Sequence, residues 1–176
     1  MPVKARAKAP STPTFMDPAL MPWVLVSELY WMSYKLLERR MYHLGVGASQ
    51  ARVLTVLYYA AGPMKPSLIA TLLFQETQSI TGILNRIESR GWVARKPDPD
   101  DRRAVGLRLT DAGRKLTEQI VQISRELYDE LFTAALSTAE RRQVEAALRK
   151  VRALGFKMPE TDFKLRRAQQ FPIWKD

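Results

Sequence analysis

The polar residues of segment 77–90 are spaced so that they share one face of a helix. Apolar residues recur there at i, i+3, i+4 and i+7, which predicts a helix with one buried stripe. Amide and hydroxyl side chains on the opposite face can hydrogen-bond to base edges or phosphates, and a glycine lets a helix backbone approach DNA closely. A solvated amphipathic helix is the alternative interpretation, because such side chains are common on any protein surface. The candidate contacts are Gln78, Ser79, Thr81 and Asn85 for bases, Arg86 for phosphate and Gly82 for the close approach.

A short charged loop follows this segment at residues 97–103. Two prolines keep it out of a helix, and the flanking segments 92–96 and 104–109 read as short β-strands, which predicts a hairpin. An arginine at the tip of a hairpin can enter a minor groove, so Arg103 is a candidate contact that Asp101 could hold in place, and Arg102 is a further one. The alternatives are a solvated charged turn and a calcium loop, but the loop lacks the required glycine and distal glutamate.

Capping and breaking residues mark the helices around these two features. Helices are predicted over residues 21–44, 49–60, 68–73, 77–90, 111–135 and 138–154. Ser49, Ser67 and Thr110 are the expected N-caps of three of them, and Ser137 with Glu140 has the spacing of a capping box. Helix, short helix, helix and then a hairpin with a charged tip is the order of a winged helix-turn-helix. The predicted fold class is mainly α with a small β-hairpin wing (α+β), together with a helical dimerisation region.

The composition limits the chemistry that the chain can perform. It has 176 residues, a net charge of +10 and a pI of about 10.1, so nucleic acid and anionic membrane surfaces are the partners to consider. With no cysteine and a single histidine, a thiol nucleophile, a cysteine-ligated zinc and a histidine cluster are excluded. The sequence contains no phosphate loop and no Gly-x-Ser-x-Gly motif, so we expect neither an enzyme nor a cofactor. No secretory signal or membrane-length apolar run is visible, so we expect a cytoplasmic protein without a membrane partner.

Residues 98–110, Asp-Pro-Asp-Asp-Arg-Arg-Ala-Val-Gly-Leu-Arg-Leu-Thr, followed by Asp-Ala-Gly, resemble the wing signature of the MarR family of transcription regulators. The similar helix order extends over roughly residues 21–154. The resemblance implies a homodimer that binds double-stranded DNA at a pseudo-palindromic operator, represses neighbouring genes and releases DNA when a small ligand binds. It gives the wing roles to Asp101 and Arg103, whereas Gly82 stands where many relatives carry a larger, often basic residue. Upstream, the resembling residues are Ser79, Ile80, Thr81, Leu84, Arg86, Ile87, Glu88, Arg90, Gly91, Trp92 and Val93.

The first predicted helix, residues 21–44, is apolar on most of its sides. Such a helix is buried on most sides, which in a chain of this size suggests burial against a second subunit. A two-fold dimer also reads two half-sites about 34 Å apart on DNA, whereas one recognition helix covers too few bases. We therefore expect a disordered basic tail (1–17), a winged-helix domain (18–155) and an irregular C-terminal extension (156–176). Within the domain, residues of about 46–110 would bind DNA, and helices 20–44 and 111–154 would form the dimer.

By the same resemblance, ligands lie between the dimer helices and the DNA-binding lobe, which makes the first helix the candidate lining. Its aromatic residues offer flat apolar walls with polar edges, and basic residues about two turns further on could hold a carboxylate or a phenolate. We hypothesise that the effector is a small aromatic acid or its CoA thioester. The aromatic residues could instead be core and dimer seam, and the chain could be an architectural or protein-binding DNA binder without a small-molecule effector. The candidate ligand contacts are Tyr30, Trp31, Tyr34, Arg39, Arg40 and His43.

Overall fold

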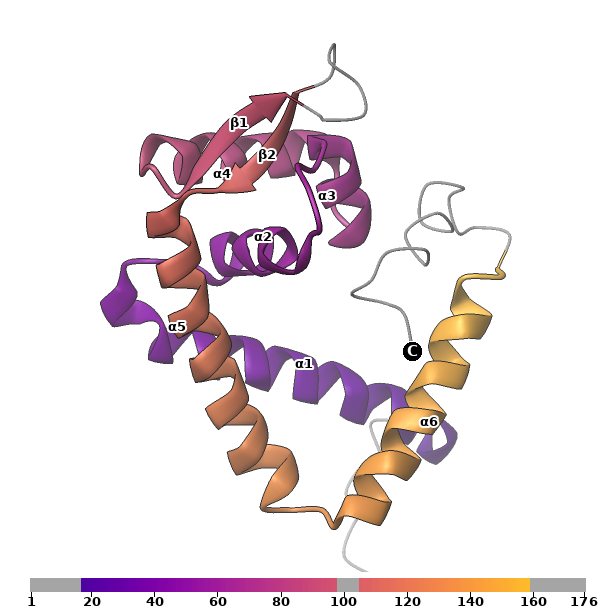
Figure 1. Cartoon of the computed structure of the whole chain (residues 1–176). Helices are drawn as coiled ribbons and strands as arrows, with labels where there is room; N and C mark the ends of the chain where they lie inside the picture. The colour runs from indigo at the N-terminus through magenta and orange to yellow at the C-terminus, as the bar shows by residue number, and fades with distance from the viewer. Residues whose placement is uncertain (1–16, 98–104, 159–176) are drawn as a thin grey trace, which may run out of the picture.

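Three helices and a β-hairpin form the upper lobe in Figure 1, a computed structural model of the chain that describes residues 17–97 and 105–158. The lobe contains α2 (Ala48–Tyr59), α3 (Pro66–Leu72), α4 (Thr77–Ser89), β1 (Val93–Pro97) and β2 (Val105–Leu109). From the hairpin, α5 (Asp111–Tyr128) runs down one side, α1 (Met21–Arg40) crosses below the lobe, and α6 (Thr138–Gly155) rises on the other side. Short 3-10 turns flank α1 (η1, Pro18–Leu20, and η2, Tyr42–Leu44), and a π-helical turn (η3, Asp129–Thr133) follows α5. The prediction of a mainly helical chain with one small hairpin is confirmed.

One apolar face of each element builds the core of the upper lobe. The buried residues of α4 are the four that the sequence predicts, Ile80, Ile83, Leu84 and Ile87. Burial of this stripe decides which face of the helix points outward. The stripe belongs to a larger buried cluster that includes Val53, Leu54, Ile69, Leu72, Val93 and Leu107.

The hairpin is fixed to the helices at its base. β1 and β2 pair antiparallel with Val93 opposite Leu109. Met64, which lies between α2 and α3, exchanges two backbone hydrogen bonds with Leu107, at 3.0 and 2.9 Å. Gly106 is required at this contact, because a Cβ there would overlap the ring of Pro63. The hairpin therefore projects from the lobe in a fixed direction, and its tip, residues 98–104, lies outside the described residues.

The start of α5 is locked to the turn that precedes the hairpin. Thr110 caps the helix as predicted, since its Oγ1 accepts a hydrogen bond from the backbone N–H of Gly113 at 3.0 Å. The same hydroxyl donates to the carbonyl of Gly91 at 2.6 Å. A Cβ at Gly113 would overlap the backbone carbonyl of Trp92, so only glycine permits this close packing. The start of α5 is thereby joined directly to the base of the hairpin.

The structure corrects the limits of two predicted helices. The first ends at Arg40 rather than at residue 44, because Gly45 adopts a left-handed conformation (φ 64°) and a 3-10 turn precedes it. The fifth ends at Tyr128, and the residues up to Thr133 form the π-helical turn. The capping box of α6 is confirmed, with Ser137 as its N-cap.

Two predicted N-caps are wrong. Ser49 lies inside the first turn of α2, whose cap is Gly47; the backbone N–H of that glycine donates to the side chain of Gln50 at 3.0 Å. Ser67 lies inside α3, which begins at Pro66 because the fixed φ of proline suits the first helical position. Each helix therefore starts one or two residues earlier than predicted.

Candidate nucleic-acid interface and adjoining cavity

The outward face of α4 presents a row of polar side chains above its buried stripe. All six residues that the sequence nominates on this helix are exposed. Their exposure follows from the burial of the apolar stripe, since side chains on the other side of the helix must face solvent. The exposed candidates are Gln78, Ser79, Thr81, Gly82, Asn85 and Arg86.

Hydrogen bonds within α4 orient two of these side chains. The Thr81 hydroxyl donates to the carbonyl of Thr77 at 2.8 Å, so its oxygen can still accept a hydrogen bond. Arg86 donates from Nε to the carbonyl of Gly82 at 3.2 Å, which draws the guanidinium back along the helix toward that glycine. A Cβ at Gly82 would meet no heavy atom of the protein within 4 Å, so its outer side faces open space. Gly82 therefore leaves the backbone of α4 accessible at the middle of the exposed face.

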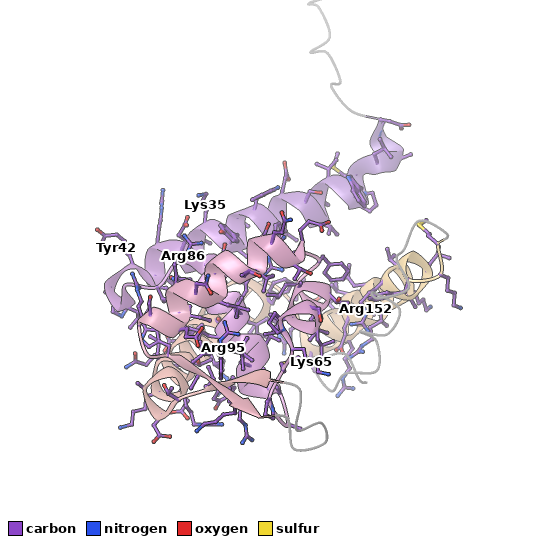
Figure 2. The ribbon with its side chains drawn as sticks, turned by 90° about the horizontal axis from the view of Figure 1, so that it is seen from above. Lys35, Tyr42, Lys65, Arg86, Arg95 and Arg152 are labelled. Carbon is purple, nitrogen blue, oxygen red and sulfur yellow. The ribbon has the colours of Figure 1, made fainter. Side chains whose placement is uncertain are left out.

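Basic residues of α4, β1 and the segment before α3 are seen from the same side as the exposed face of α4 (Figure 2). Figure 2 looks onto this face and labels Arg86 on α4, Arg95 on β1 and Lys65 just before α3, and all three are exposed. Arg95 forms an ion pair with Glu88 at 3.1 Å, which ties the wing to α4. Basic side chains around a polar helix face are the arrangement that neutralises DNA phosphates while the helix lies in a groove. The wing-tip candidates Asp101, Arg102 and Arg103 lie outside the described residues.

The turn between α3 and α4 sets the position of α4. Phe74 stands at this turn with φ of 55°, a left-handed conformation that is uncommon for a bulky residue. The backbone N–H of Gln75 donates to the carbonyl of Ala70 at 3.0 Å and closes the turn. From α2, Arg52 reaches the carbonyl of Leu73 with its Nη2 at 3.4 Å. The turn is thus held from both sides before α4 begins.

A cavity of about 990 Å³ opens beneath this turn, between the lobe and the long helices. Its walls come from α1, α2, the end of α3, α5, η3 and α6, and most of the lining is aliphatic or aromatic. Hydroxyl groups of Ser33, Thr55 and Ser124 add polar points. Among the described residues that line it, Arg52 is the one that carries a charge. The cavity can accept an apolar molecule of drug-like size, and Arg52 can bind an anionic group on it.

The nominated ligand residues divide into two groups. Tyr30 and Tyr34 line the cavity, and their ring centroids lie 6.3 Å apart. Trp31 is 60% exposed and is not part of the cavity lining. The three basic candidates of the first predicted helix are not part of the lining either: Arg39, Arg40 and His43.

Arg40 has a structural partner that the sequence does not show. Its guanidinium donates to both carboxylate oxygens of Glu130, at 2.9 and 2.5 Å. These hydrogen bonds raise the pKa of Arg40 and lower the pKa of Glu130. The pair joins the end of α1 to η3, the segment whose Phe132 lines the cavity.

Arg52 is not among the ligand contacts predicted from the sequence, because those predictions concern the first helix and Arg52 lies on α2. The signal that the sequence does contain is a lone basic residue among the buried positions of α2.

A second apolar surface covers α1 and α6. No residue of α1 is buried within the single chain, although the sequence predicts burial on most sides. Trp23 is 74% exposed, and Val151 on α6 is 69% exposed. Neither a cluster of metal-ligating side chains nor a helix long and apolar enough to cross a membrane occurs within residues 17–97 and 105–158. The exposed apolar side chains of these helices include Leu25, Val26, Leu29 and Leu148, which also line the cavity, and Met21, Met32 and Leu154, which do not.

Comparisons with known proteins agree with this arrangement. Residues 44–104 match the sequence profile of the MarR family. The multiple antibiotic resistance protein MarR of Escherichia coli K12 is 33% identical over 118 residues, a match that spans 66% of this chain and 81% of that protein.

Two solved structures show the same fold. A mutant of the E. coli MarR protein in complex with operator DNA aligns with a TM-score of 0.64 at 28% identity, and covers 77% of this chain and 99% of that one. CouR from Rhodococcus jostii RHA1, crystallised with p-coumaroyl-CoA, aligns with a TM-score of 0.69 at 21% identity, and covers 77% and 95% of the two chains. The likeness to CouR supports the fold alone. The winged helix-turn-helix prediction is confirmed.

Proposed function

The chain belongs to the MarR family of transcription regulators, and from this premise we propose that it is a dimeric repressor that a small aromatic acid, or its CoA thioester, releases from a pseudo-palindromic operator. The observation that carries the proposal is the exposed polar face of α4. Six candidate contacts stand outward on a helix whose apolar stripe is fully engaged, and basic residues flank them. A related protein is known with operator DNA bound on this fold.

Dimerisation is supported by the apolar surface of α1 and α6. Large exposed apolar patches on a folded chain mark interaction sites, and Trp23 and Val151 lie on the two helices that form this surface. A second copy would cover it and complete the burial that the sequence predicts for α1. In a two-fold dimer, two α4 helices would reach successive major-groove segments on one side of the duplex.

The cavity supports a ligand with an apolar body and one anionic group. Tyr30 and Tyr34 provide flat walls, and Arg52 supplies a cation that can bind a carboxylate or a phosphate oxygen. CouR holds p-coumaroyl-CoA, in which an aromatic acyl group is joined to a carrier that bears phosphates. We therefore place the anion contact at Arg52 rather than at Arg40, whose guanidinium already binds both oxygens of Glu130.

Release follows from the position of the cavity between two parts of the molecule. Leu72 and Phe74 of its lining lie at the helix-turn-helix, whereas Ile120 and Phe132 lie on the long helix and the turn that follows it. A ligand that contacts both sides prefers one arrangement of α5 relative to the lobe. It releases DNA if this arrangement moves the two α4 helices away from the operator spacing.

Substitutions on α4 test the DNA-binding proposal. Asn85→Ala should raise the operator Kd by an amount equivalent to about 1–3 kcal/mol at particular base pairs, because it would remove a base contact. Arg86→Ala should weaken binding to all sequences alike and reduce the salt dependence by about one phosphate contact. Fluorescence anisotropy with operator and scrambled duplexes measures both effects. Equal loss on every duplex for both variants would remove Asn85 from base recognition.

Calorimetry with benzoate- and cinnamate-type acids, and with their CoA thioesters, tests the effector. We expect at least one of them to bind the wild type, and Arg52→Gln to weaken that binding about tenfold or more, because it removes the charged hydrogen bonds to the anion. Arg39→Gln is the matched control, since this exposed arginine lies away from the cavity. No heat from any of the acids would contradict the effector class, and equal losses in both variants would contradict the assignment of Arg52.

A further inference from the structure

The end of α6 lies at the rim of the cavity. Phe156 directly follows the helix and is 7% exposed, and its ring centroid lies 6.3 Å from that of Phe74. Phe74 is itself part of the cavity lining, as are Val144 and Leu148 on α6. The chain therefore leaves α6 beside the opening of an apolar cavity, next to the turn that precedes the recognition helix.

The sequence beyond this point contains an apolar run of the right character to occupy the cavity. Phe171, Pro172, Ile173 and Trp174 are consecutive, and they follow a polar stretch that includes Arg166. Residues 159–176 lie outside the described part of the chain. From residue 158 to residue 171 the chain can span at most about 45 Å, so reach does not limit a contact with a cavity whose rim is one ring away from Phe156.

The chemistry of the segment and that of the cavity agree. The lining is apolar except for hydroxyl groups and Arg52, so it gains most from burying aromatic and aliphatic side chains. Proline in the segment restricts its backbone, which lowers the entropy that docking must overcome, and it has no N–H to leave unsatisfied. A covalent connection to α6 also gives the segment a high effective concentration at the cavity.

Part of this chain lies beyond what it shares with the compared structures. The two aligned structures are covered over 95% and 99% of their lengths, whereas each match leaves about a quarter of this chain outside. We propose that residues 171–174 dock into the cavity of their own chain and act as a built-in competitor of the effector. The docking stands independently, whereas its role as a competitor rests on the proposed function.

Cysteine cross-linking tests the docking directly, because the natural chain contains no cysteine. Ile173→Cys is combined with Thr55→Cys on α2 or with Ser33→Cys on α1, two positions in the cavity lining. Mild oxidation should close an intramolecular disulfide in at least one of these pairs about tenfold faster than in the control pair, because docking raises the effective concentration of the two thiols. The control pair combines Ile173→Cys with Ser67→Cys, an exposed position on α3.

The products of the cross-linking distinguish the occupants of the cavity. Intramolecular disulfides, seen as monomers on a denaturing gel, support the proposal. Disulfide-linked dimers would overturn it in favour of docking into a second copy of the chain. Closure no faster than in the control pair, at both cavity positions, would show that the segment stays outside the cavity.

Binding of an apolar anionic dye, anilinonaphthalene sulfonate, provides a second measurement that needs neither DNA nor the natural effector. If residues 171–174 fill the cavity nine-tenths of the time, Ser substitutions at Phe171, Ile173 and Trp174 should strengthen dye binding about tenfold. The control variant carries the same number of Ser substitutions just before the docking segment, at Lys164, Arg166 and Arg167. It should change dye affinity by less than about twofold. Unchanged dye affinity in the apolar variant would overturn the proposal. If the disulfide closes but none of the acids releases the protein from DNA, the docking is supported and only the proposed function is contradicted.

Discussion

Gly82→Ala separates DNA recognition from stability, because the structure predicts opposite effects on the two. Gly82 lies near the middle of the 13-residue helix α4, and a Cβ there would meet no heavy atom within 4 Å. Alanine in a helix interior is more favourable than glycine by about 1 kcal/mol. The variant should therefore unfold about 2–4 °C higher than the wild type in a thermal melt.

The same methyl group should weaken operator binding. On the exposed face of α4 it would occupy the space through which the backbone approaches DNA, and we expect the Kd to rise about tenfold, equivalent to about 1.4 kcal/mol. The melt shows that the fold is intact, and fluorescence anisotropy at fixed salt gives the Kd. Gly155→Ala is the control for the added methyl group, because its Cβ also meets no heavy atom within 4 Å and it lies outside α4, at the last residue of α6. A stabilised Gly82→Ala protein that binds the operator as tightly as the wild type would refute the close approach of α4 to DNA.

Three further substitutions test how the lobe and the long helices are joined. Gly113→Ala should lower the free energy of unfolding by about 2 kcal/mol or more, since its methyl group overlaps the Trp92 carbonyl; chemical denaturation measures the loss. Glu130→Gln should lower the Tm at neutral pH, because the hydrogen bond from Arg40 holds the pKa of this carboxyl below its ordinary 4.5. That stabilisation is complete above pH 4.5 and is lost as the pH falls through the lowered pKa, so the Tm difference from the wild type should vanish in acid. Ser137→Ala should cost about 1 kcal/mol in the same denaturation assay, because it removes the cap of α6.

Local periodicity was sufficient to predict α4 and the two strands of the hairpin. The stripe of Ile80, Ile83, Leu84 and Ile87 fixes both the helix and its outward face, because burial of one side leaves the other side exposed. The alternation around Leu107 predicted β2 for a similar reason. α4 and β2 can be predicted because residues that lie close together in the sequence decide which face of each element is buried.

The lining of the cavity could not be predicted in the same way. Arg40 and Glu130 are 90 residues apart in the sequence, so nothing near Arg40 indicates that its guanidinium is engaged. Arg52 lines the cavity only because α2 packs against both α1 and α5, a tertiary arrangement without a local signal. The N-caps of α2 and α3 were predicted at Ser49 and Ser67 because serine is a common N-cap. In the structure Gln50 hydrogen-bonds to the backbone of the actual cap, Gly47, and Pro66 takes the first position of α3, so both helices begin earlier.

Specific binding to an operator is the central claim, and one titration tests it most directly. Fluorescence anisotropy with duplexes tiled across the region upstream of the gene, against a scrambled duplex and at two salt concentrations, separates sequence recognition from the attraction of a chain with a net charge of +10 for any DNA. We predict tight binding to one inverted-repeat duplex that persists at the higher salt concentration. Equal, salt-sensitive binding to every duplex would contradict an operator in that region and favour a winged-helix protein that coats DNA without selecting a sequence.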